Sequence, residues 1–274
     1  MHCGSDLSSY REFVGFPLTS LVLAVRQLSG VEHLASPSNR GLEELDLELN
    51  IQSAEQAQAA FRALSVQLQR LPKLRSLVVH IPWRSYANRH PKPNLQAVND
   101  TEWHLPSLTS LRVKGALVTA IDRLPRLHAP KLARLEAQEL AFSCLATAIR
   151  QFPALTAFDS GSTKAGIDVD VAALLQALAS CDRVWPNMTR FSASERLPAA
   201  FCGAIAQWQQ LCDLIVWLPS STHPRRVTAM LRALPNLEAA DILRHEVAAA
   251  VEPAPPALEN STVFSMQRLA ILRL

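Results

Sequence analysis

The 274-residue sequence has few aromatic residues, few glycines and no long apolar run. Phenylalanine, tryptophan and tyrosine make up only 6% of it, whereas hydrophobic residues together make up 49%. This composition favours a core of stacked aliphatic layers, because burial of apolar area is the main driving force of folding. No run approaches the roughly 18 apolar residues of a membrane-spanning helix. We therefore expect no membrane association.

Neither sign of charge dominates, since 27 Lys and Arg stand against 24 Asp and Glu, a net charge of +3. This balance argues against a nucleic acid or an anionic membrane as the partner. The eight glycines are scattered and form no phosphate-binding loop, and the sequence contains neither HExxH nor GxSxG. We expect no catalytic residues and no cofactor, and therefore a protein that is not an enzyme.

Cysteine and histidine are also arranged without a recognisable site. Five cysteines, an odd number without CxxC spacing, argue against a disulfide framework or a zinc site and favour a reducing compartment. The apolar run Phe13–Val25 contains Pro17 and lacks a small-residue cleavage pattern, so we do not interpret it as a signal peptide. His80, His90 and His104 lack the i, i+4 spacing of metal ligands, and no metal site is expected. The predicted location is the cytoplasm, with the nucleus as the alternative.

What the sequence does contain is a repeated leucine motif. The motif has apolar residues at i, i+3 and i+5, as at Leu74, Leu77 and Val79, with a proline two residues ahead at Pro72. Weaker copies without that proline begin at Leu18, Leu42, Leu211 and Met266. Further copies with the proline occupy Leu105–Val113, Ala129–Ala137, Phe152–Ser160, Trp185–Ala193 and Leu234–Ile242. Self-similarity at intervals of 20 to 40 residues is typical of a repeat architecture.

The period of the apolar residues changes between motifs. Within each motif the last two apolar positions alternate as in a strand, and the first packs on the same core from the turn before it. Between motifs the apolar residues recur with the helical period of 3.6. The predicted helices are Ser53–Leu71, Ala141–Gln151, Val169–Ser180, Pro198–Gln209 and Arg225–Leu234. Alternating strands and helices predict an α/β fold of parallel strands joined by crossover helices.

The proline-led motif with intervening helices resembles the leucine-rich repeats of the ribonuclease-inhibitor-like class, and it is similar to the repeat region of fungal F-box proteins. The resemblance covers Pro17 to Leu274 and implies a horseshoe-shaped solenoid of about ten repeats. The strands would line its concave face and the helices its convex face. The segment Met1–Phe16 is too short for an F-box, so we expect that module not to be present.

We expect a single domain over residues 1–274 with two interruptions. Residues 83–104 carry prolines and only weak helical periodicity, which indicates a loop inserted into the array. Residues 252–262 are rich in proline and predict an extended loop. The loop at 83–104 also contains a mixture of side chains that is common at binding surfaces. These loop candidates are Arg84, Tyr86, Arg89 and Trp103.

The exposed side of the predicted sheet is the principal candidate site. Strand side chains alternate, so the residues that flank the last apolar position of each motif point away from the core. Adjacent strands lie about 4.8 Å apart, so these residues would form two rows across the sheet. The rows include Ser192, Ser194, Ile215 and Leu272. The candidate partner-binding residues are Asp46, Glu48, His80, Arg112, Lys114, Glu136, Asp159, Trp217 and Leu243.

Three functions are compatible with this prediction. The first is a non-enzymatic scaffold that binds a protein partner on the concave face. The second is the substrate-recognition part of an F-box-type ubiquitin-ligase adaptor. The third is a GTPase-activating repeat protein, in which Arg84 or Arg89 would enter a nucleotide site. The identity of the partner and the oligomeric state are not predicted by any of these patterns.

Overall fold

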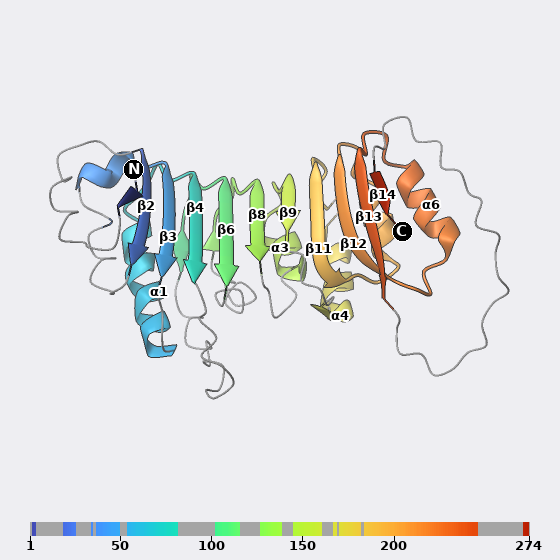
Figure 1. Ribbon diagram of the computed structural model, residues 1–274, viewed down its shortest axis with the longest axis horizontal. Helices are drawn as coiled ribbons and strands as arrows, with labels where there is room; N and C mark the ends of the chain where they lie inside the picture. The colour runs from blue at the N-terminus through green and yellow to red at the C-terminus, as the bar shows by residue number, and fades with distance from the viewer. Residues whose placement is uncertain are drawn as a thin grey trace.

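The computed structural model contains a large open parallel sheet of twelve strands (Figure 1). It describes residues 2–3, 19–25, 34, 37–49, 54–81, 102–115, 127–138, 145–160, 167–168, 170–181, 184–245 and 271–273. The predicted α/β fold with parallel strands is confirmed. Eleven of these strands follow one another in the spatial order β1 (His2–Cys3), β2 (Ser20–Val25), β3 (Glu44–Leu49), β4 (Ser76–Ile81), β6 (Ser110–Gly115), β8 (Arg134–Gln138), β9 (Ala157–Asp159), β11 (Arg190–Arg196), β12 (Asp213–Pro219), β13 (Ala239–His245) and β14 (Ile271–Arg273), and the twelfth, β10 (Ile167–Asp168), pairs with β11 outside this order.

The helices follow individual strands along the chain and lie behind or beside the sheet in Figure 1. Each of the five predicted helical ranges overlaps one of them, with ends that differ by up to four residues. A second sheet pairs β5 (Trp103–His104) with β7 (Leu127–His128). The helices are α1 (Ala54–Leu68), α3 (Leu145–Gln151), α4 (Val171–Ala179), α5 (Phe201–Ile205) and α6 (Pro224–Arg232), and a 3-10 helix spans Pro37–Gly41.

A hydrogen-bonded turn precedes most strands of the large sheet. In the turn Leu71–Leu74 the amide of Leu74 donates to the carbonyl of Leu71 at 3.2 Å, and Pro72 takes the second position. Proline suits this position because its ring fixes φ near the value that a type I or II turn requires. The first residue of each turn is buried as well, so the repeated motif has a fourth core position. Equivalent turns end at Leu42, Leu108, Leu132, Leu155, Met188, Leu211 and Leu237.

One carbonyl per motif joins each turn to the next. The carbonyl of Glu43 accepts hydrogen bonds from the amides of Arg75 and Ser76, at 2.8 and 2.9 Å. The same two-donor arrangement occurs eight times between consecutive motifs. Where this position is a threonine, as at Thr109, its hydroxyl donates to the preceding carbonyl of the series as well, at 3.0 Å. The carbonyls that accept two amides belong to Thr19, Glu43, Arg75, Thr109, Ala133, Thr156, Thr189 and Cys212.

These bonds align the motifs residue for residue. Leu45 of β3 lies opposite Leu77 of β4, which lies opposite Leu111 of β6. All three are almost completely buried, as are the first apolar positions from Leu42 to Leu237. Side chains on a parallel sheet alternate between faces. A shared register therefore places the buried leucines of all the motifs on the side that the helices cover.

The core changes character along the sheet. From β3 to β8 it is mainly leucine and valine, but from β9 to β12 it is aromatic. The ring centroids of Phe158 and Phe191 lie 5.5 Å apart, and those of Phe191 and Trp208 lie 4.9 Å apart. In this part of the described core, aromatic side chains therefore stand where the composition predicts aliphatic layers. Two buried indoles also donate to backbone carbonyls, Trp185 to Phe152 at 2.9 Å and Trp208 to Val184 at 2.7 Å.

Two places depart from the predicted register. In β11, the three residues 193–195 lie opposite the single residue Val216 of β12, which is a bulge. Strand β10 (Ile167–Asp168) pairs with β11 at the same point, after β9 has ended. The last strand is displaced by three residues from the prediction, because Leu272 rather than Leu269 lies opposite the buried Ala240.

The predicted loops lie mostly outside the described residues, which exclude 82–101 and 246–270. The end of the first loop is described and is part of β5 rather than a projecting loop. In the part of the chain that the structure describes, no helix is long and apolar enough to cross a membrane.

We expect Trp208→Phe to destabilise the protein while keeping most of the aromatic packing. The phenyl ring cannot donate to the buried carbonyl of Val184, and a buried unsatisfied group costs about 1–3 kcal/mol. The free energy of unfolding from urea titration, followed by circular dichroism, measures the loss. Trp217→Phe, at a half-buried indole on the opposite face, is the matched control and should change stability by less than about 0.5 kcal/mol. Equal losses in the two variants would contradict the role of the hydrogen bond.

Candidate functional site

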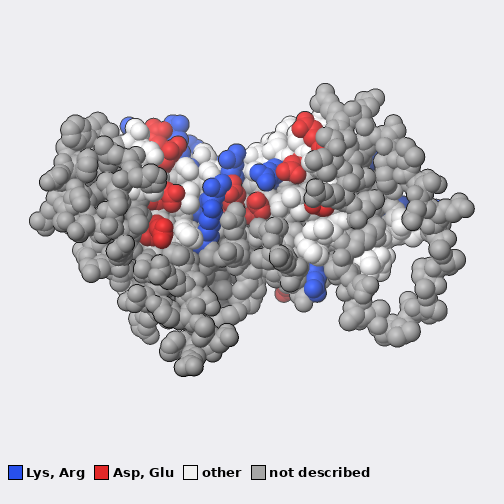
Figure 2. Space-filling model, in the orientation of Figure 1, with Lys and Arg blue, Asp and Glu red and all other residues white. Residues whose placement is uncertain are grey.

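The sheet side chains that alternate with the buried leucines form a continuous exposed surface, which we call the open face. In β3, Leu45 and Leu47 are buried, whereas Asp46 is half-buried and Glu48 is exposed. The alternation continues in β4, β6 and β8. Figure 2 shows this surface, with acidic groups gathered over β3 and basic groups over β6.

Most of the predicted site residues lie in rows across the open face, as expected from their positions in the motif. The first row runs in register from Asp46 through Val78, Arg112 and Glu136 to Asp159. The second row runs from Glu48 through His80 to Lys114, and then to Gln138. The structure thus brings seven of the predicted residues together on five neighbouring strands. The seven residues are Asp46, Glu48, His80, Arg112, Lys114, Glu136 and Asp159.

A third row belongs to the same face and was not predicted. It consists of the residue immediately before the second apolar position, which shares the parity of the other two rows. Extending the alternation of each motif by two residues toward the N-terminus would have found it. The row is Glu44, Ser76, Ser110, Arg134, Ala157, Arg190, Asp213 and Ala239.

Arg112 is neutralised within the face. Its guanidinium Nε donates to Oε2 of Glu136 on the adjacent strand, and the Glu136 side chain is only 15% exposed. This hydrogen bond, opposed by desolvation, lowers the pKa of Glu136 and raises that of Arg112. The carboxylates of Asp46 and Asp159 stabilise the Arg112 cation further through space. Arg112 therefore serves mainly to hold the acidic side chains around it in place.

The other charges of the face divide into paired and unpaired groups. Arg190 Nε lies 3.3 Å from Oδ2 of Asp213 on the neighbouring strand. Arg75, at the edge of the face, lies 3.9 Å from Glu43. Neither Glu48 nor Lys114 forms an ion pair with any residue in the described ranges. Their charges are thus available to an external ligand.

The C-terminal part of the face is more apolar. Trp217 of β12 lies opposite Leu243 of β13, and both side chains are half-buried. Ile215 lies beside Asp241 in the adjacent row. In β14, Leu272 lies opposite Ala240 rather than opposite Leu243, where the motif spacing predicts it.

Two predicted positions of β11 are not exposed on the face, and one of them lies in the bulge. Ser192 and Ser194 are buried rather than exposed, and Arg196 instead of Ser194 lies opposite Trp217. The hydroxyl of Ser160 donates to Oε2 of the buried Glu195 at 2.6 Å, and it accepts from the amide of Ser194 at 2.8 Å. This buried polar cluster was not predicted, because a bulge leaves no clear signal in the spacing of the motif.

The structure describes only one of the four loop candidates. Arg84, Tyr86 and Arg89 lie outside the described residues. Trp103 is a buried core residue, which corrects its prediction as a surface contact. It lies in β5, where β7 pairs beside it, and its neighbour His104 stacks on His128 with ring centroids 4.5 Å apart.

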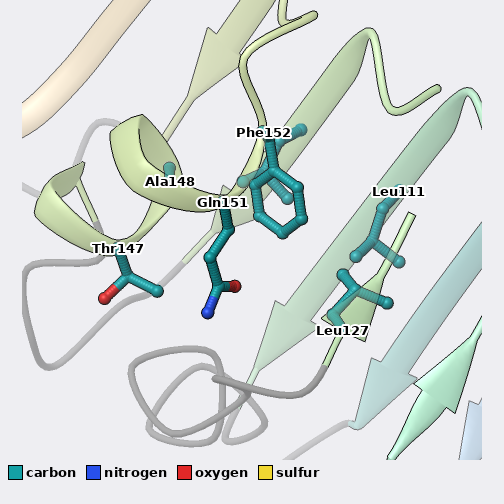
Figure 3. A pocket seen from close by; sticks show the side chains of 7 residues that line it. Leu111, Leu127, Thr147, Ala148, Gln151 and Phe152 are labelled. Carbon is teal, nitrogen blue, oxygen red and sulfur yellow. The ribbon is translucent and has the colours of Figure 1, made fainter. Parts of the chain in front are cut away.

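No catalytic or metal-binding arrangement stands out from the described geometry. Across those ranges, no three His, Cys, Asp or Glu residues are grouped to hold a metal ion. Cys202 is buried, and this burial raises the pKa of its thiol. A cavity of about 10 Å³ lies beneath β6 and β8, too small for more than a single water molecule. Figure 3 shows Gln151 extending from the end of α3 among the residues that line this cavity.

No protein-family model and no curated protein matches this chain.

We expect Glu136→Gln to make the protein less sensitive to acid. The folded-state pKa of Glu136 is lowered, so its ion pair contributes stability above the ordinary carboxyl value of 4.5 and loses it as pH falls through the folded-state pKa. The wild type should therefore lose more unfolding free energy between about pH 6 and pH 3 than the variant. Urea titrations across this range measure the difference. Glu48→Gln is the control and should retain the wild-type slope, since Glu48 forms no ion pair with any residue that the structure describes.

Gln151→Leu should stabilise the protein by about 1 kcal/mol. Oε1 of Gln151 is buried without a hydrogen bond, and its neighbours in the cavity include Leu111, Leu127 and Leu135. Leucine removes the unsatisfied acceptor and keeps the apolar contacts. Thermal and urea unfolding measure the gain, with Gln207→Leu at an exposed position as the neutral control. A loss of stability in Gln151→Leu alone would show that the amide has a partner that leucine cannot replace.

Proposed function

We propose that this protein is a non-enzymatic scaffold of the leucine-rich repeat class that binds a protein partner on its open face. The proposed architecture is a solenoid of about ten repeats. It is supported by consecutive motifs that form adjacent parallel strands, by their shared register and by the recurring turn before each strand. An elongated sheet of this kind offers a large contact surface.

The observation that carries the proposal is the arrangement of unlike surfaces on one rigid sheet. Acidic and basic side chains lie over β3 to β9, and Trp217 with Leu243 lies at the other end. Side chains held by a hydrogen-bonded sheet lose little freedom on association, so more of the contact energy appears as affinity. Tryptophan is also prominent among residues that dominate binding energy.

The test is a quantitative affinity capture that compares variants of the whole chain. The double variant Lys114→Glu and Trp217→Ala alters both ends of the face without disturbing the Arg112–Glu136 pair. We expect it to lose captured proteins by about tenfold or more relative to the wild type, as identified by mass spectrometry.

The control carries the same kinds of change on the helical layer, where Arg225→Glu and Leu175→Ala replace exposed residues. It should capture as much as the wild type. Circular dichroism establishes that each variant is folded. Capture that is equal in all three proteins would reject the open face as the binding surface.

A further inference from the structure

The open face between β3 and β6 separates negative from positive charge. All three outward positions of β3 are carboxylates, whereas the outward positions of β4 hold no Asp, Glu, Lys or Arg and those of β6 hold two cations. Figure 2 shows the acidic and basic groups as two bands with little charge between them. The outward residues are Glu44, Asp46 and Glu48 on β3, Ser76, Val78 and His80 on β4, and Ser110, Arg112 and Lys114 on β6.

The two bands differ in how much charge remains for a ligand. The Arg112 cation is held by Glu136, so Lys114 is the cation of β6 that can meet an external carboxylate. On β3 the Asp46 carboxylate is attracted toward Arg112, and Glu48 has no ion pair among the described residues. Glu48 and Lys114 belong to the same row, with His80 between them.

The register fixes the separation of these two charges. Glu48 and Lys114 lie two strands apart, which corresponds to about 10 Å at the usual spacing between strands. A peptide in the polyproline II conformation advances about 3.1 Å per residue with three residues per turn, so its residues i and i+3 lie about 9 Å apart on the same side. A peptide that crosses the strands can therefore place opposite charges on both groups at once.

We propose that the open face binds a segment of a partner protein in the polyproline II conformation, in which a Lys or Arg and an Asp or Glu occupy positions i and i+3. The cation of the segment lies over Glu48 and its carboxylate over Lys114, and the surface of Val78 and His80 accommodates the residues between them. The proposal rests on the proposed function of the open face and specifies the chemistry of the partner. Charge complementarity at this fixed spacing selects the partner and its direction across the strands.

The experiment is a selection of random 12-residue peptides, displayed on phage, against the immobilised full chain. Peptides with opposite charges three residues apart should be enriched about tenfold over peptides with the same composition at other spacings. The variant Lys114→Glu should abolish the preference for Asp or Glu and keep the preference for Lys or Arg. Glu48→Lys should have the converse effect.

Arg225→Glu, on α6, is the matched control and should select the same peptides as the wild type. Enrichment without a charge spacing, or a spacing that persists in both Lys114→Glu and Glu48→Lys, would overturn the proposal. A dimer in sedimentation that Lys114→Glu dissociates would also overturn it, since the occupant would then be a second copy. The double variant Lys114→Glu and Trp217→Ala separates this proposal from the proposed function. If that variant still loses its captured proteins, a failed peptide selection leaves the proposed function supported. If that capture is unchanged, the proposed function fails as well.

Discussion

The structure depends on one backbone carbonyl in each turn that accepts two amide hydrogens from the next motif. The carbonyl of Glu43 accepts from Arg75 and Ser76, and the arrangement recurs from Thr19 to Cys212. Because the acceptor and the first donor occupy the same position in consecutive motifs, the bond fixes the register at the start of each strand. A shift by a single residue would turn every leucine to the opposite face.

The shared register also determines which residues are neighbours on the open face. Once equivalent positions are aligned, residues more than twenty positions apart in sequence become neighbours, as Arg112 and Glu136 do. Their ion pair removes one cation from the surface, whereas Glu48 and Lys114 keep their charges. The binding properties of the open face thus follow from which pairs the register brings together, and composition alone does not reveal them.

The bulge in β11 shows what happens where the register changes. There the side chains of Ser192, Ser194 and Glu195 are buried, and Ser160 bonds to the Glu195 carboxylate instead of filling its core position with an apolar group. A buried carboxylate is costly unless it is hydrogen-bonded, so this cluster ties β9 and β11 together where the ladder is interrupted. The aromatic cluster around Phe191 lies in the same part of the core.

The sequence by itself determined most strands of the large sheet, their parallel order and most of the exposed rows, because the leucine spacing and the turn prolines are local signals repeated along the chain. It also placed the helices to within a few residues. The tertiary structure alone decided the burial of Trp103, the bulge in β11, the three-residue displacement of β14 and the pairing of Arg112. Each of these depends on contacts between segments distant in sequence, for which the local spacing carries no information.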